Sequence, residues 1–308
     1  MLARLLLTIC LLATACICGT AQALQVRSAS SRQPLPYATI VHLPTGWAAV
    51  ANGAGQLVLP AQLLQHAQPR WRISYTGYQV LDTTLQQPTT VYLQPQPDTL
   101  RPVAVYPCSS YEPAQLKNHH RPKADFYLGS AGDQTLLMSW AAHVPNSSGR
   151  RGWLQQVHFW IDNLAAPKAV MKTPFRLRFL EWDSARQQPG QPLSWQELVV
   201  QPNGGEMVTA ELDSLHIPLP AEGLVVAIDF FDAGPAYRYE ASTHVHMPNG
   251  RDTVRIADRY GPSIRATTFD SGVHGFYFNF KTSRWFPFFF GQRPAAPLVR
   301  VEVRQCRL

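Results

Sequence analysis

The sequence contains little charge and no dense run of basic residues. Only 15% of the 308 residues are Asp, Glu, Lys or Arg, and the net charge of +7 is spread thinly along the chain. Nucleic-acid binding would need these charges concentrated on one face or along one helix. We therefore expect no nucleic-acid partner for this protein.

Long hydrophobic runs are absent after the amino-terminal region. The one apolar run, Leu5–Ile17, follows the basic residue Arg4 and precedes the small-residue sequence AQA at 21–23. A charged start, an apolar centre and an A-x-A site are typical of a secretory signal peptide. The run is also shorter than the roughly 20 apolar residues of a membrane-spanning helix. We therefore interpret residues 1–23 as a removed signal peptide and expect an exported mature chain without a transmembrane span.

Cysteine is scarce once this leader is removed, because only Cys108 and Cys306 remain. In an exported chain two cysteines favour one disulfide, which here would close a long loop and contribute about 4–5 kcal/mol in the chain-entropy model. Two unpaired thiols are the alternative, because spacing does not establish geometry. In the leader, small residues precede Cys16 and Cys18, so a lipoprotein acylated on one of them is an alternative to a cleaved signal peptide.

The sequence also lacks long amphipathic helix patterns. Short alternating runs bounded by Pro, Gly, Asn and Asp recur instead, which is typical of an all-β protein. The mature length suits two domains. We expect a β-sandwich at residues 24–95, a linker strand at 96–108 and a second β-sandwich at 109–308.

Four segments of the first domain follow one another in a family-like order. They are PLPYATI (34–40), ANGAGQLVL (51–59), ISYTGYQ (73–79) and VYLQP (91–95). Together they resemble the carboxypeptidase-regulatory-like domain. The resemblance implies a seven-stranded transthyretin-like or immunoglobulin-like β-sandwich. Members of this family occur beside carboxypeptidase catalytic domains and at the front of TonB-dependent outer-membrane receptors, so the resemblance implies a docking or regulatory-like module without chemistry of its own.

The second domain contains roughly eight or nine strand patterns. Phe175–Phe179 alternates between apolar and basic residues, which indicates one buried face, whereas Leu224–Ile228 is continuously apolar, as in a strand covered on both faces. Together these strand patterns predict a jelly-roll-like β-sandwich. The segments KTPFRLRFLEWD (172–183) and IPLPAEGLVVAIDF (217–230) resemble the β-rich carboxy-terminal region of uncharacterised exported proteins that carry the same amino-terminal module.

Catalytic motifs of the types G-x-S-x-G, S-x-x-K and H-x-x-E are missing from the chain. His244 and His246 would share one face of a strand and are weak candidates for metal ligands. Zinc needs three or four ligands, so we predict no metal and no cofactor. Asp229 and Asp232 follow a buried strand and are the best candidates for the acid pair of a glycoside hydrolase.

Aromatic residues are more suggestive, because many large rings occur in loops and at strand ends of the second domain. The candidate binding residues are Trp182, Trp195, Tyr237, Trp285, Phe286 and Phe288. The run from Phe286 to Phe290 cannot face one core with every ring, so some rings should meet another strand, a partner or a membrane surface.

These patterns favour a non-enzymatic, exported cell-envelope protein of the periplasm, outer membrane or cell surface. In this interpretation the first domain docks, and the second sandwich binds a partner protein, a glycan or another envelope component. The alternative is an unrecognised hydrolase of envelope polymers that uses acids of the carboxy-terminal domain.

Overall fold

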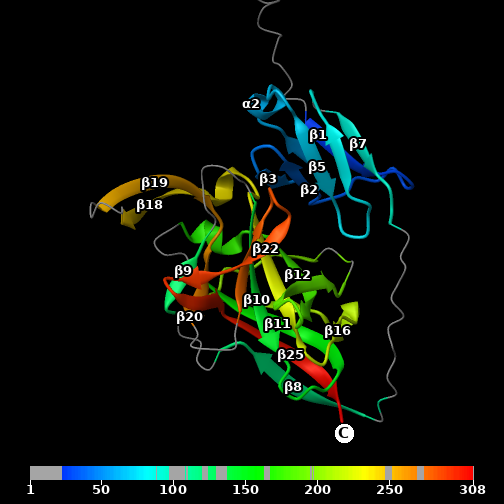
Figure 1. Cartoon of the computed structure of the whole chain (residues 1–308), viewed down its shortest axis with the longest axis vertical. Coiled ribbons are helices and arrows are strands. Elements are labelled where there is room, and N and C mark those ends of the chain that lie inside the picture. The colour runs from blue at the N-terminus through cyan, green and yellow to red at the C-terminus, as the bar shows by residue number, and fades with distance from the viewer. Residues whose placement is uncertain are drawn as a thin grey trace, which may run out of the picture.

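The computed structural model of the protein describes the backbone of residues 23–87, 89–96, 108, 110–119, 124–129, 137–162, 167–194, 196, 198–246, 252–268 and 274–307, and their side chains except in 241–246 and 252–257. Residues 1–22 of the predicted signal peptide, with Cys16 and Cys18, and the candidate Trp195 lie outside the described residues. The described chain is nearly all β (Figure 1). The predicted all-β fold with two β-sandwiches is confirmed.

The first sandwich pairs a three-stranded sheet with a four-stranded sheet, seven strands together. The three-stranded sheet is ordered β4 (Gln56–Val58), β1 (Ala23–Ser28) and β7 (Thr90–Leu93). The four-stranded sheet is ordered β3 (Trp47–Val50), β2 (Thr39–His42), β5 (Arg70–Ser74) and β6 (Leu81–Thr84), and a single helical turn, α2 (Ala61–Leu64), follows β4.

The core of the first sandwich lies between these sheets. Alternation along β1 buries Leu24 and Val26, because successive side chains of a strand point to opposite faces. On the other sheet, Ile40 of β2 pairs in register with Ile73 of β5, and both are fully buried next to Trp71. Each sheet therefore contributes one apolar face to a common core.

The second sandwich contains a seven-stranded and a nine-stranded sheet. The first is ordered β13 (Gln188–Pro192), β12 (Phe175–Asp183), β17 (Gly223–Phe231), β10 (Leu137–Pro145), β21 (Gly275–Asn279) and β22 (Arg284–Pro287), with β14 (Leu198–Val200) on β12. The second is ordered β23 (Phe289–Phe290), β24 (Arg293–Pro297), β20 (Ser263–Thr268), β11 (Gly152–Asp162), β25 (Val299–Cys306) and β8 (Tyr111–Lys117), with β15 (Met207–Glu211) and β16 (Pro218–Leu219) on β11 and β9 (Phe126–Leu128) on β20. Short helical turns are η1 (Lys168–Lys172), η2 (Asp213–Leu215) and η3 (Pro235–Tyr237).

The central strand β17 is buried along its whole length, as its continuous apolar run predicts. Leu224, Val226 and Ile228 lie in the core between the two sheets. Val225 and Ala227 lie on the opposite face, where a smaller apolar cluster covers them. Because both faces are covered, any polar side chain on this strand must find its partners inside the protein.

A two-stranded ribbon, β18 (Arg238–His246) with β19 (Asp252–Tyr260), extends from the body of the second sandwich (Figure 1). Its base is anchored, because Arg238 pairs with Asp232 and Tyr260 is buried in the main core. Such an anchor matters because an isolated two-stranded hairpin is marginally stable in water.

The second sandwich is also closed covalently. Cys108 and Cys306 form a disulfide with their Cα atoms 5.6 Å apart, which ties the chain just before β8 to the end of β25, its partner strand. The 198-residue separation makes the closed loop very long. No helix among the described residues is long and apolar enough to cross a membrane.

The two sandwiches share an apolar boundary, and Figure 1 shows the first resting on the end of the second. Val41 and Val50 of the first sandwich pack with Leu137 and Phe231 of the second. The ring of Tyr37 lies 5.6 Å from that of Phe231. This boundary continues directly into the charged network described next.

Candidate functional site

Asp229 lies at the centre of a buried network of charged and polar side chains. The register of the sheet places Arg176 of β12 and Ser139 of β10 directly beside it on either side. Ser139 Oγ donates to Oδ1 over 2.5 Å, and Arg176 Nε donates to Oδ2 over 2.8 Å. Arg178 Nη2 donates to Oδ1 over 2.8 Å. The carboxylate of Asp229, which is 0% exposed, is therefore fully satisfied by side chains of its own sheet.

The environment of Asp229 stabilises its ionised form. Burial raises its pKa, but the charges of Arg178 and Arg176 and the hydrogen bonds from Arg178 and Ser139 together lower it to about 2. A group sealed from solvent and held ionised in this way serves as one partner of a structural ion pair.

Arg176 also connects this network to the first sandwich. Its Nη2 donates to Thr39 Oγ1 over 3.1 Å, and its Nη1 donates to the carbonyl oxygen of Tyr37 over 3.3 Å. Arg176 is 4% exposed. Its planar array of donors thus joins β12 to the start of β2 across the boundary.

Asp232, the second acid singled out in the sequence, has a different environment. It lies just after β17, where one carboxylate oxygen accepts the backbone N–H of Gly234 over 3.0 Å. The other oxygen accepts from Arg238 at the base of the ribbon. Asp232 therefore closes a turn and anchors β18, and neither it nor Asp229 lines the surface depression described below.

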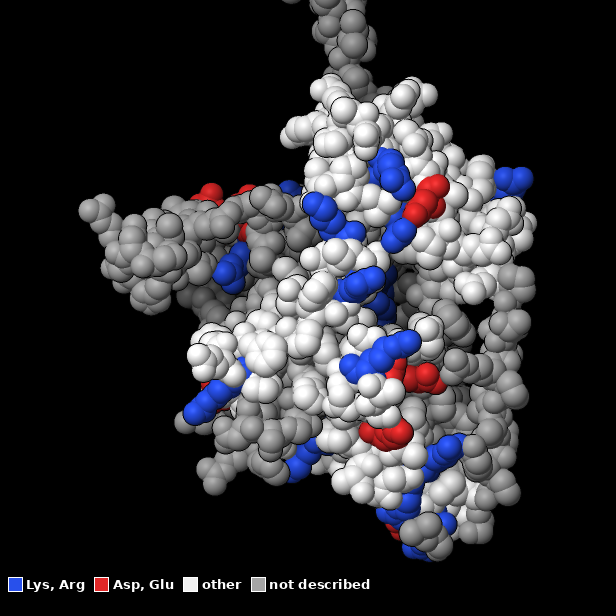
Figure 2. Space-filling view, viewed as in Figure 1, with Lys and Arg blue, Asp and Glu red and all other residues white. Residues whose placement is uncertain are grey.

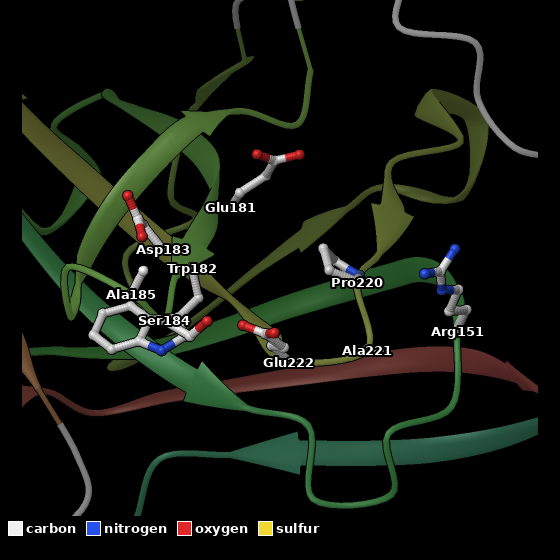
Figure 3. Close-up of a pocket in the computed structure, with 9 residues that line it drawn as sticks. All are labelled: Arg151, Glu181, Trp182, Asp183, Ser184, Ala185, Pro220, Ala221 and Glu222. Atoms are coloured by element: carbon white, nitrogen blue, oxygen red, sulfur yellow. The ribbon is translucent and has the colours of Figure 1, made fainter.

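An open depression of about 370 Å³ lies at the ends of β12 and β16. Its lining residues are Arg151, Glu181, Trp182, Asp183, Ser184, Ala185, Pro220, Ala221 and Glu222. Figure 3 shows Arg151 at one end, well apart from Trp182 and Asp183 at the other. Three carboxylates and one guanidinium give the rim a net negative charge.

Trp182 is the one aromatic residue that lines this depression, but it is itself mostly buried. Its indole stacks on the ring of His143 at 4.0 Å with an interplanar angle of 10°, and on that of His274 at 5.6 Å. Burial is the main cause that lowers the pKa of His143 to about 4, so the imidazole is neutral near pH 7. These stacked rings cover Ala141, Val225 and Phe276 on the outer face of the sheet.

A row of six aromatic rings runs through the second sandwich from β23 to β22. The row consists of Phe290, Phe126, Phe288, Trp140, Tyr277 and Phe286, with successive ring centres 4.4, 6.0, 4.9, 6.5 and 5.6 Å apart. Phe126, Phe288 and Trp140 pack against the main core. We refer to these six side chains as the aromatic row.

The end of the aromatic row at β23 is exposed to solvent. Phe290 and its neighbour Phe289 are each 54% exposed, and Tyr127 of β9 is 41% exposed. Phe290 stacks on Phe126 at 4.4 Å with an interplanar angle of 7°. Phe290 is thus held on one side by Phe126 and open to solvent on the other.

The aromatic candidates from the sequence fall into three places. Phe286 and Phe288 belong to the aromatic row. Trp182 and Trp285 belong to the outer cluster, where the guanidinium of Arg178 lies 5.4 Å from the ring centre of Trp285. Tyr237 ends η3, half-buried, and its carbonyl oxygen accepts the N–H of Gly261. The structure therefore does not bring these side chains into one site.

Sequence reasoning missed Phe126, Tyr127, Trp140 and Tyr277. Phe126 and Tyr127 of β9 and Trp140 of β10 lie far along the chain from Phe288 and Phe290, so no local pattern relates them. Tyr277 of β21 is nearer, because it pairs with Phe286 across the β21–β22 hairpin. One signal was present for Tyr127, because the strand FYL alternates a half-buried ring, an exposed ring and a buried leucine.

The weak metal candidates His244 and His246 lie two residues apart in β18, and His246 pairs in register with Asp252. Their side chains lie outside the described residues. Among the side chains that the structure does describe, no group of three His, Cys, Asp or Glu residues is placed to hold a metal ion.

Comparison of the chain with protein-family models, with curated proteins and with solved structures finds no match. The likeness of residues 34–95 to the carboxypeptidase-regulatory-like domain therefore stays a prediction from the sequence. The function has to be argued from the surfaces of this chain itself.

Proposed function

We propose that the protein is a non-enzymatic, exported cell-envelope protein whose second sandwich binds an envelope component at the exposed end of the aromatic row. One observation carries the proposal: the neighbouring rings Phe289 and Phe290 of β23 each expose 54% of their surface, where Phe290 ends the packed row of rings. Single exposed apolar residues are ordinary, whereas contiguous ones mark interaction sites.

The packing beneath these rings makes the surface suitable for binding. Phe290 rests on Phe126, which contacts Phe288, and Phe288 rests on Trp140. Rings that are already held in place lose little conformational freedom when a ligand covers them. Aromatic side chains are also enriched at the centres of protein interfaces.

The first sandwich serves in this proposal as a docking module with a fixed orientation. Arg176 hydrogen-bonds to Thr39 and to the Tyr37 carbonyl inside the boundary, and Arg72 of β5 donates to Ser283 Oγ over 2.8 Å at its surface. Because contacts at two places connect the sandwiches, a partner of the first would hold the aromatic row in a defined direction.

Sedimentation with isolated cell envelopes tests the proposal. The double variant Phe289→Ser/Phe290→Ser should bind envelopes at least about tenfold more weakly than the parent chain, since two large apolar surfaces are lost. Tyr111→Ser is the matched control, because Tyr111 is a comparably exposed ring (44%) on β8. Equal binding of the double variant and the parent would refute the proposal.

A glycan array separates one version of this function from the others. Trp285→Ala serves there as a comparison, because Trp285 was a candidate for sugar stacking but lies against Arg178 and Phe278. If Phe289→Ser/Phe290→Ser loses glycan binding and Trp285→Ala keeps it, the glycan site lies at the exposed end of the aromatic row. Absence of binding to every glycan would remove the sugar version and leave protein or lipid components.

A further inference from the structure

We propose that the tip of the β23–β24 hairpin inserts into the headgroup region of an anionic lipid surface. The inference rests on the proposed function, because it names the envelope component that covers the exposed end of the aromatic row. It is carried by the arrangement of rings and charge on this hairpin.

The hairpin places one ring on each of its faces. Phe289 pairs in register with Pro294 and Phe290 pairs with Arg293, so that a two-residue turn of Gly291 and Gln292 joins the strands. Neighbouring residues of a strand point to opposite faces. Phe290 therefore faces Phe126, and Phe289 projects from the other face, yet both rings are 54% exposed.

This two-sided arrangement favours a lipid surface over a flat partner. A flat surface docked on one face would cover Phe290 or Phe289 and leave the other ring in water. A medium that surrounds the tip removes both rings from water at once, and the benefit of burial is proportional to the apolar area removed. The tight turn keeps the tip narrow, with Gly291 in the left-handed region at φ 62°.

The headgroup region also suits the polar parts of the tip. Backbone groups in the hydrocarbon core have to be satisfied internally, and the N–H and C=O groups of a two-residue turn are not all paired in this way. Apolar faces that bind at a membrane surface enter only about 5–10 Å, to the boundary between headgroups and acyl chains. At that depth water and headgroups can hydrogen-bond the turn while the rings reach the acyl chains.

The charge around the hairpin complements anionic headgroups. Arg293 is exposed and lies directly opposite Phe290, on the same face of the hairpin. Residues 281–297 contain three basic side chains, Lys281, Arg284 and Arg293, and no Asp or Glu. Figure 2 shows a mainly uncharged surface with few acidic side chains over β9 and β22. Basic residues near an inserted apolar face strengthen binding to anionic lipids.

Vesicle sedimentation tests the inference with lipid as the sole ligand. The parent chain should sediment with vesicles of phosphatidylcholine and phosphatidylglycerol in equal amounts, and less with phosphatidylcholine alone. Phe289→Ser/Phe290→Ser should bind the mixed vesicles at least about tenfold more weakly, whereas Tyr111→Ser should bind like the parent. Arg293→Gln should lose about threefold at low salt, and this difference should shrink at high salt because ions screen exposed charges.

A second variant locates the tip directly. In Phe289→Trp the new indole should be quenched by lipids brominated on their acyl chains, measured as the difference from the parent chain with its own tryptophans. This measurement does not depend on the folding of the serine variant. An indole at position 289 that bound vesicles leave unquenched would overturn the inference.

The outcomes distinguish this inference from the proposed function. If the parent chain does not bind vesicles, or if Phe289→Ser/Phe290→Ser binds them as well as the parent, the lipid assignment is wrong. If the double variant nevertheless binds cell envelopes more weakly than the parent, a protein or glycan covers the same rings and the proposed function stands. If neither envelopes nor vesicles distinguish the double variant from the parent, both proposals fail.

Discussion

Charged residues usually lie on a protein surface and large aromatic residues usually lie inside, but two regions of the second sandwich show the opposite. In the buried network, the charged residues Asp229 and Arg176 are 0% and 4% exposed. At the β23 tip, Phe289 and Phe290 are each 54% exposed. The two regions therefore differ in role. The buried charges around Asp229 have all their partners inside the protein, whereas the rings of Phe289 and Phe290 keep about half of their surface in contact with solvent.

The buried network around Asp229 contributes more to the orientation of the two sandwiches than to net electrostatic stabilisation. Removing two charges from water is expensive, and their mutual attraction offsets this only with good geometry and further hydrogen bonds. Arg176 meets that condition by directing its remaining donors to Thr39 and Tyr37 of the first sandwich. We infer that the network fixes how the sandwiches meet, whereas the exposed tip keeps its surface for a ligand.

Replacing Asp229 should have the largest effect on stability. Asp229→Ala leaves the buried guanidinium of Arg176 without its carboxylate, and Arg178 loses the same partner. Breaking a buried pair by removing one partner costs about 3–5 kcal/mol. Urea unfolding followed by circular dichroism would measure this decrease in the free energy of unfolding.

An exposed ion pair supplies the control for Asp229→Ala. Asp183 pairs with Arg186 over 3.3 Å, but the Arg186 side chain is 76% exposed. Asp183→Ala should therefore lower the free energy of unfolding by less than about 1 kcal/mol. Similar losses in the two variants would show that the buried network contributes no more than a surface pair.

Acid should weaken the same network within a defined pH window. The pKa of Asp229 is lowered from an ordinary 3.8 to about 2 in the folded protein, so its contribution is fully present above pH 4 and is lost as the pH falls towards 2. This shift corresponds to roughly 2–3 kcal/mol. The free energy of unfolding of the parent should fall more steeply than that of Asp229→Asn between pH 4 and 2.

Other carboxylates also titrate in this range, so the difference between the two proteins is the informative quantity. Asp82 has a pKa lowered mainly by its hydrogen bond with Arg72, and it is present in both the parent and Asp229→Asn. Parallel acid slopes for the two proteins would contradict an ionised, stabilising Asp229.

A smaller change tests the connection between the sandwiches. Thr39→Val keeps the shape of the side chain but removes the Oγ1 that accepts from Arg176. A hydrogen bond to a charged donor is lost, and the expected decrease in the free energy of unfolding is about 1.5 kcal/mol. Thr84→Val on the exposed edge strand β6 is the control and should change this free energy by less than about 0.5 kcal/mol. If Thr39→Val lowers the free energy of unfolding no more than Thr84→Val does, the connection between the sandwiches that we assign to Arg176 is refuted.

The architecture followed from the sequence more readily than the two unusual regions. Alternating runs and turn residues predict an all-β fold with two sandwiches, and the apolar run Leu224–Ile228 predicts a strand covered on both faces. The same run placed Asp229 just after the buried strand, as a candidate cleft acid. In the structure β17 continues to Phe231, so Asp229 lies inside the sheet.

The partners of these residues could not be predicted, because contacts between strands depend on register. Arg176 and Ser139 lie 53 and 90 residues from Asp229 along the chain, and alternation within one strand does not indicate its neighbours. For the aromatic row, the sequence indicates that Phe286 to Phe290 cannot all face one core. It does not indicate that Phe126 and Trp140 support them.

Removing the exposed rings should have the smallest effect on stability. In Phe289→Ser/Phe290→Ser, the lost side chains are already about half in water, so we expect the free energy of unfolding to change by less than about 1 kcal/mol. Phe288→Ser is the control one residue away, because Phe288 packs against Trp140 and the main core. Truncating a ring with such contacts should cost about 3 kcal/mol. If the double variant lost as much stability as Phe288→Ser, Phe289 and Phe290 would belong to the fold. A small loss of stability combined with a large loss of binding would instead separate the surface kept for a ligand from the rings that support it.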